Sequence, residues 1–182
     1  NLAFRNRGDL SFAENGREWG FDQVGISQGM ALADLDQDGD LDAVINNENA
    51  PALLLENRST APRLAVRLRG RGANTQAIGS RLEVRGGPVP QSQEIIAGGR
   101  YASGDDPMRV FAAGHATNRL SVEVLWRSGR RSSFGPFAPN QMVELEEPDG
   151  PVAAASASTP APTALFQDVS SRLLHQHRDA SF

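Results

Sequence analysis

Apolar and polar positions alternate with a period of two along much of this chain. The alternation is clearest over residues 120–126, and it recurs over residues 63–69, 81–85 and 142–146. A period of two places the apolar side chains on one face of a β-strand and the polar ones on the other. Further strands are expected where shorter apolar runs stand between turn residues, over residues 2–12 (a hairpin), 30–32, 41–45, 53–55, 93–97 and 109–112, and a return strand begins at Phe134.

The composition agrees with an all-β fold. The 182 residues include 18 Gly and 11 Pro, only 6% are aromatic, and no segment shows the apolar period of a crossover helix. Short strands separated by Gly-rich turns are typical of antiparallel sandwiches and barrels. The chain has no cysteine, which excludes disulfides, thiolate metal ligands and a cysteine nucleophile. No apolar run approaches the ~20 residues that cross a bilayer, so no transmembrane segment is expected.

Charge divides the chain into unequal parts. Residues 1–57 hold eleven acids and three Arg (net −8), residues 58–131 hold thirteen Arg and five acids (net +8), and the remainder is net −4. This contrast predicts two units with complementary surfaces that contact each other within the chain. Residues 148–163 are rich in Pro, Ala, Ser and Thr and predict a linker. The chain begins without Met and opens a new element near its end, so we expect an internal piece of a longer protein.

One segment carries a strong chemical signal. Residues 34–42 read DLDQDGDLD, which places five carboxylates within nine positions. Carboxylates this close repel one another, and oxygen ligands on a flexible loop select Ca²⁺ among the hard cations. Gly39 occupies the sixth loop position, where the chain must turn sharply. We therefore predict a Ca²⁺ site with Asp34, Asp36, Asp38, Asp40 (through its main-chain carbonyl) and Asp42 as ligands. The alternative is an acidic hairpin loop that binds no metal.

Two family resemblances extend this interpretation. Residues 29–47, GMALADLDQDGDLDAVINN, resemble an FG-GAP/VCBS-type repeat of calcium-binding β-propellers, and residues 1–12 resemble the segment that joins such repeats. The following part resembles the ASPIC/UnbV domain in its AIGSRLEV (77–84), GGRYAS (98–103), VEVLWRSGR (122–130) and PNQ (139–141) stretches. The resemblance implies a propeller blade with a calcium loop (1–60), an antiparallel β-sandwich-like ASPIC/UnbV domain (61–147), the linker (148–163) and the start of a further propeller segment (164–182).

The resemblance also implies a function. Its members are generally extracellular or associated with the cell envelope, which favours a secreted or envelope location and a non-enzymatic binding or scaffold module stabilised by calcium. The alternative is an accessory or catalytic factor of the UnbV type in enediyne biosynthesis. The sequence supplies no convincing nucleophile or acid/base pair, although Asp105 and Asp106 are candidates for a catalytic pair or a second cation site.

The remaining candidates concern partners. A series of arginines follows two predicted strands and suggests contact with a protein or an anionic glycan. No aromatic side chains alternate with these arginines, so nucleic-acid binding is not expected. His175 and His177 share a face on a strand, but two histidines without a third ligand do not define a metal site. The arginine series consists of Arg63, Arg67, Arg69, Arg71, Arg81 and Arg85.

Overall fold

The structure, a computed structural model, describes residues 2–149. Within this range the chain forms fourteen strands and no helix, so the all-β expectation is confirmed. No helix in this range is therefore long and apolar enough to cross a membrane. The strands are β1 (Phe4–Asn6), β2 (Phe12–Glu14), β3 (Ser27–Ala33), β4 (Asp42–Asn47), β5 (Leu53–Leu55), β6 (Arg63–Arg69), β7 (Arg81–Arg85), β8 (Gln91–Glu94), β9 (Gly99–Arg100), β10 (Ser103–Gly104), β11 (Arg109–Ala112), β12 (Leu120–Leu125), β13 (Arg131–Phe137) and β14 (Gln141–Glu146).

The first strands form the expected hairpin, but the second strand starts later than the alternation predicts. β1 and β2 pair antiparallel, with Phe4 opposite Glu14. Leu10, predicted to resume the strand, instead lies in the turn with a φ of 66° and is almost fully exposed. The carboxylate of Asp9 accepts hydrogen bonds from the amide and hydroxyl groups of Ser11 and thereby extends the turn.

A three-stranded antiparallel sheet, in the order β3-β4-β5, follows the hairpin. Its strands match the predicted apolar runs on either side of the acidic segment, and Ile45 of β4 is 2% exposed. Ala33 at the end of β3 pairs with Asp42 at the start of β4. The acidic segment is therefore the loop at this end of the β3–β4 hairpin.

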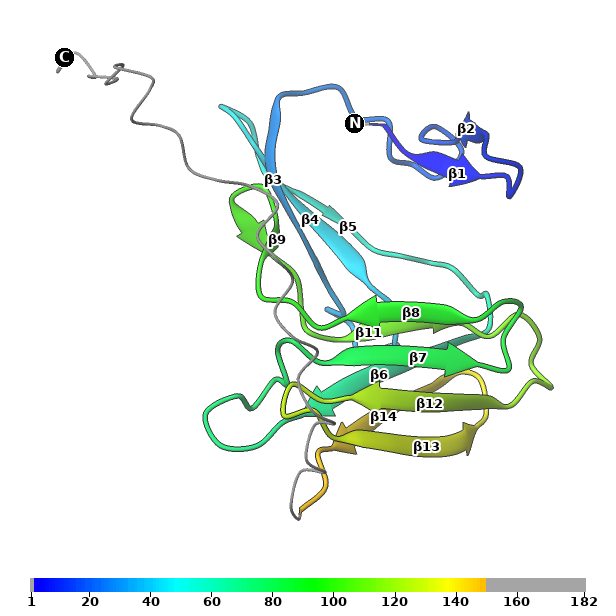
Figure 1. Ribbon diagram of the computed structural model, residues 1–182. Helices are drawn as coiled ribbons and strands as arrows, with labels where there is room; N and C mark the ends of the chain where they lie inside the picture. Colours follow the sequence, from blue (N-terminus) through cyan, green and yellow to red (C-terminus); the bar gives the residue numbers. More distant parts are fainter. Residues whose placement is uncertain (1, 150–182) are drawn as a thin grey trace, which may run out of the picture. The chain divides into compact units, whose positions relative to one another are not determined.

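Two sheets face each other in a sandwich, as Figure 1 shows. One sheet has the order β13-β12-β7-β8 and the other β11-β6-β14. The predicted inward set on residues 120–126 is confirmed, because Trp126 and its alternating apolar neighbours are fully buried. Apolar side chains from both sheets fill the interior, including Leu64, Val66, Leu82, Val84, Phe111, Leu120, Val122, Val124 and Trp126.

The sandwich departs from the expectation in two places. β14 pairs with β6 in parallel, so the domain is not wholly antiparallel. The chain changes sheet between β13 and β14, and β14 lies at the edge of its sheet beside β6. The strand predicted over residues 93–97 is β8, which begins at Gln91 and ends at Glu94. Because β8 consists of Gln, Ser and Glu, it has no apolar alternation from which its bounds could be predicted.

Side-chain amides join the two sheets along one side of the sandwich. Gln91 of β8 donates to the carbonyl of Ala112 (2.8 Å) and accepts from its amide (3.0 Å), while Gln93 donates to the carbonyl of Val110 (2.9 Å). β8 and β11 are the edge strands of their sheets. The glutamines thus occupy main-chain groups that an edge strand would otherwise leave unpaired.

Candidate metal centre

The acidic loop joins β3 to β4 and contains two residues in the left-handed backbone conformation. Gln37 has a φ of 65° and Gly39 a φ of 88°. Such values disfavour a continuing strand and are easily adopted by glycine. The two apolar strands on either side hold the ends of the loop in register, so its residues fold back over one another.

This folding brings three carboxylates together. Asp34, Asp36 and Asp42 each place a carboxylate oxygen within 4.8 Å of the others. Asp42 is buried, Asp34 is half-buried and Asp36 is exposed. The cluster offers only oxygen ligands and opens toward solvent, which suits a hard cation. The charge of such a cation would remove the mutual repulsion of the carboxylates.

Main-chain amides hold these carboxylates in place. Asp42 accepts from Leu35 N at 2.9 Å and from Asn57 N at 2.8 Å. Asp34 accepts from Asp38 N at 3.1 Å and from Gly39 N at 3.2 Å. Each carboxylate oxygen has two lone pairs, so these bonds orient the oxygens and leave acceptor capacity for a cation.

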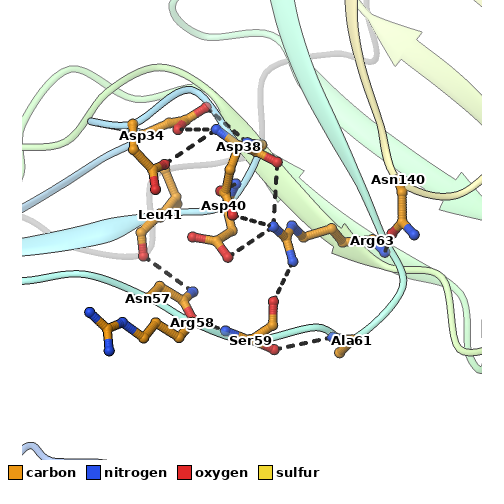
Figure 2. A network of polar contacts seen from close by, with 12 residues as sticks. Asp34, Asp38, Asp40, Leu41, Asn57, Arg58, Ser59, Ala61, Arg63 and Asn140 are labelled. Atoms are coloured by element: carbon orange, nitrogen blue, oxygen red, sulfur yellow. Dashed lines mark hydrogen bonds and ion pairs between the residues drawn. The ribbon is translucent and has the colours of Figure 1, made fainter.

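The other two aspartates contact an arginine rather than the cluster. Arg63 Nη2 lies 2.8 Å from Asp38 Oδ2 and 3.0 Å from Asp40 Oδ2. Figure 2 shows the guanidinium between these carboxylates and the main chain of Ser59. The sequence predicted all five aspartates as ligands of one ion, with Asp40 binding through its main-chain carbonyl. The structure gathers the carboxylates of Asp34, Asp36 and Asp42 and pairs those of Asp38 and Asp40 with Arg63.

Asp40 has the most perturbed environment of the loop. Its side chain is only 4% exposed, and neither oxygen accepts a hydrogen bond of good geometry, although Oδ2 lies close to Arg63. Burial raises the pKa of Asp40 to about 6. The positive charge of Arg63 lowers that pKa, and the negative charges of Asp38, Asp42 and Asp36 raise it further.

The loop lies against the outward face of β6. A Cβ placed on Gly39 would lie 3.8 Å from the Cβ of Ala65, and Ala65 is fully buried although it stands outside the sandwich core. Arg63 and Arg67 share this face of the strand. The acidic segment therefore contacts the arginine-rich segment within the chain, in accord with their opposite net charges.

A second junction uses both aspartates of the candidate catalytic pair. Asp105 Oδ1 accepts from Leu32 N (2.8 Å), and Arg100 Nε lies 2.7 Å from the same oxygen. Asp106 Oδ2 lies 3.1 Å from Arg67 Nη2, and its main-chain amide donates to Leu32 O at 2.8 Å. The Asp105 carboxylate and the main-chain amide of Asp106 thus hold β3, while the Asp106 carboxylate binds Arg67 of the sandwich strand β6.

The arginine series does not form one cationic face. Arg67 belongs to the β11-β6-β14 sheet and Arg81 to the opposite sheet, so their outward faces point away from each other. Each of the six arginines has an oxygen partner within the chain. The partners are Asp38 and Asp40 for Arg63, Asp106 for Arg67, Glu144 for Arg69, Asp149 and the carbonyl of Glu147 for Arg71, Ser92 for Arg81, and Glu83 for Arg85.

Sequence reasoning missed the residues that support the loop from outside it. Asn57 and Ser59 lie in the connection after β5, and Arg63 was singled out only as part of the arginine series, not as a partner of the loop. The only signal in the sequence was the opposite charge of neighbouring segments. The predicted His175 and His177 pair, most of the linker and the segment 164–182 lie outside the described residues.

Similarity to known proteins covers most of this chain. Residues 70–152 match the family model described as ASPIC and UnbV, so this part of the chain is similar to those domains. Cartilage acidic protein 1 of Xenopus tropicalis is 31% identical over 156 residues, which cover 82% of this chain and 21% of that protein. The chain spans about a fifth of the length of this relative.

Proposed function

We propose that this chain is a calcium-stabilised, non-enzymatic module that serves as a binding or scaffold part of a larger protein outside the cytoplasm. The observation that carries the proposal is the convergence of Asp34, Asp36 and Asp42, whose carboxylate oxygens lie within 4.8 Å of one another. Ca²⁺ takes six to eight oxygen ligands, and main-chain carbonyls and water would complete the shell.

The ligands of the proposed calcium site also indicate where the protein is located. Three carboxylates on a partly exposed loop suit a site of modest affinity, and such sites fill where calcium is in the millimolar range, as outside cells. The 31% identity to cartilage acidic protein 1 supports the same location. Bound calcium would replace the repulsion in the loop by attraction and would fix the corner between β3 and β4.

We further propose that the β3-β4-β5 sheet is one blade of an FG-GAP/VCBS-type propeller. The acidic loop joins its first two strands, as the repeat resemblance implies. Large apolar side chains on and beside this sheet, Leu54 and Ile26, are exposed, and a neighbouring blade would cover such side chains. Determining the structure of the full-length protein and counting its blades tests this part of the proposal.

Calcium titration of the 182-residue chain tests the metal site. We expect isothermal titration calorimetry to detect one Ca²⁺ per chain and chelation to lower the melting temperature. At calcium a hundredfold above Kd the stabilisation is about 2.7 kcal/mol. Asp34→Asn should lose both effects, whereas Glu123→Gln, on the outward face of β12, should keep them. An unchanged melting temperature on chelation, with no calorimetric binding, would refute the calcium site.

A further inference from the structure

The first residue of the sandwich strand β6 reaches into the acidic loop. Arg63 Nη2 contacts the carboxylates of Asp38 and Asp40 and also lies 3.4 Å from the carbonyl oxygen of Asp38. The Arg63 side chain is 16% exposed and that of Asp40 is 4% exposed. An ion pair at this depth is screened far less by solvent and salt than one on an open surface.

The position of the guanidinium is fixed from outside the loop. Arg63 Nη1 donates to Ser59 O at 2.7 Å, and the main-chain amide of Arg63 donates to Asn140 Oδ1 at 3.3 Å. The main-chain amide of Asn140 in turn donates to Arg63 O at 2.6 Å. Asn140 directly precedes β14, so the turn that enters this strand also anchors the start of β6.

A second contact lies two residues further along β6. Ala65 is fully buried against the loop, where Gly39 approaches it. The loop thus meets β6 through a charge pair at residue 63 and lies next to residue 65, where a Cβ added to Gly39 would be 3.8 Å from the Cβ of Ala65. Any change in the shape of the loop must be accommodated at both points.

We propose that Arg63 couples the cation site to the sandwich by neutralising Asp38 and Asp40, so that calcium bound by the other three carboxylates stabilises the β3-β4-β5 sheet and the sandwich together. The inference rests on the proposed calcium site. Arg63 is a positioning residue here: it supplies a fixed positive charge from the sandwich strand β6 to the loop of the β3-β4-β5 sheet. Loss of the arginine would leave buried negative charge without a partner on the loop side of the junction.

The two tryptophans of the chain permit a direct test. Trp126 lies in the sandwich core with 1% exposure, whereas Trp19, in the N-terminal segment, is 55% exposed. Trp19→Phe therefore leaves Trp126 as the reporter of sandwich unfolding. In this parent variant of the full chain, we expect saturating Ca²⁺ to raise the thermal midpoint read from Trp126 fluorescence.

Adding Arg63→Gln should reduce that calcium-induced shift to about half or less of the parent value, while calorimetry still detects calcium. Calcium should bind no more weakly than in the parent, because the change removes positive charge beside the site. Arg63→Lys, which keeps the charge, should retain part of the shift. Arg69→Gln, an exposed arginine on the same strand, should retain all of it.

The outcomes separate this inference from the proposed function. Calcium binding without any shift at Trp126 in the parent variant would overturn the coupling and leave the calcium site intact. An equal shift in the parent and in Arg63→Gln would overturn the role of Arg63. The absence of calcium binding in the parent would overturn both. The parent measurement decides the coupling even if Arg63→Gln does not fold.

Discussion

Asp105 accepts a hydrogen bond at 2.8 Å from the main-chain amide of Leu32, a residue 73 positions earlier in the chain. The amide of the adjacent Asp106 donates to the carbonyl of the same leucine. Both main-chain groups of Leu32 on the open edge of β3 are thereby satisfied by a segment that leads into the sandwich. The contact completes the edge of the β3-β4-β5 sheet and joins this sheet to the segment that leads into the sandwich.

Removal of the Asp105 carboxylate should therefore destabilise the fold. Asp105→Ala leaves the Leu32 amide and the guanidinium of Arg100 without this acceptor, and we expect a loss of about 2 kcal/mol in the free energy of unfolding. Urea titration followed by circular dichroism measures the loss. Asp105→Asn keeps an acceptor and should lose less. Equal stability of the alanine variant and the parent would show that the contact contributes nothing.

The indole N–H of the buried Trp126, which begins the turn at residues 126–129, forms a hydrogen bond with one side chain. Trp126 Nε1 donates to Ser132 Oγ at 2.9 Å. Ser132→Ala leaves this buried N–H unpaired and should cost about 1–3 kcal/mol of unfolding free energy. Ser133→Ala is the matched control, because the neighbouring side chain points outward from β13 and is exposed. Urea denaturation should give a lower free energy of unfolding for Ser132→Ala than for Ser133→Ala.

The glutamine bridge between the sheets predicts a local change without global unfolding. Gln91→Ala removes both hydrogen bonds to the main chain of Ala112, and its effect on global stability should stay near 1 kcal/mol. Hydrogen exchange at the Ala112 amide should accelerate, since that amide loses its acceptor. Hydrogen exchange in the core strand β12 should change only as much as the global free energy of unfolding changes. Unchanged protection at Ala112 would contradict the bridge.

The regular part of the fold follows directly from the sequence. Strands such as β6 and β12 alternate apolar and polar residues, so their position and inward face are predictable from local pattern alone. The parallel pairing of β14 with β6 is not, because nothing in either strand encodes the direction of its neighbour. β8 was misplaced for a related reason: its glutamines act through side-chain bonds to β11, which an alternation of apolar residues does not reveal.

The candidate site is predictable only in part. The spacing of Asp34, Asp36 and Asp42 and the position of Gly39 are local features, and the structure places these three carboxylates together. The partner of Asp38 and Asp40 is Arg63, 25 positions after Asp38, and its approach depends on how β6 packs on the loop. Charge balance between segments indicated a contact, but it could not identify the residues.

The left-handed conformation of Gly39 leads to a prediction that separates backbone strain from crowding. At a φ of 88° an added Cβ would find the Cβ of Ala65 at 3.8 Å, an ordinary contact, so space is available for alanine. The backbone conformation still disfavours an L-residue by about 1–2 kcal/mol. Gly39→Ala should therefore lower the unfolding free energy by this amount and reduce the stabilisation by calcium.

Gly25→Ala is the control for this variant, because Gly25 does not have a positive φ and the nearest atom to its added Cβ is 3.9 Å away. Its stability should stay near that of the parent, since alanine restricts the unfolded chain without straining the folded one. The measurement is urea unfolding of both variants with calcium and with chelator. If Gly39→Ala matched Gly25→Ala in both conditions, the turn at Gly39 would not be the conformation that shapes the loop.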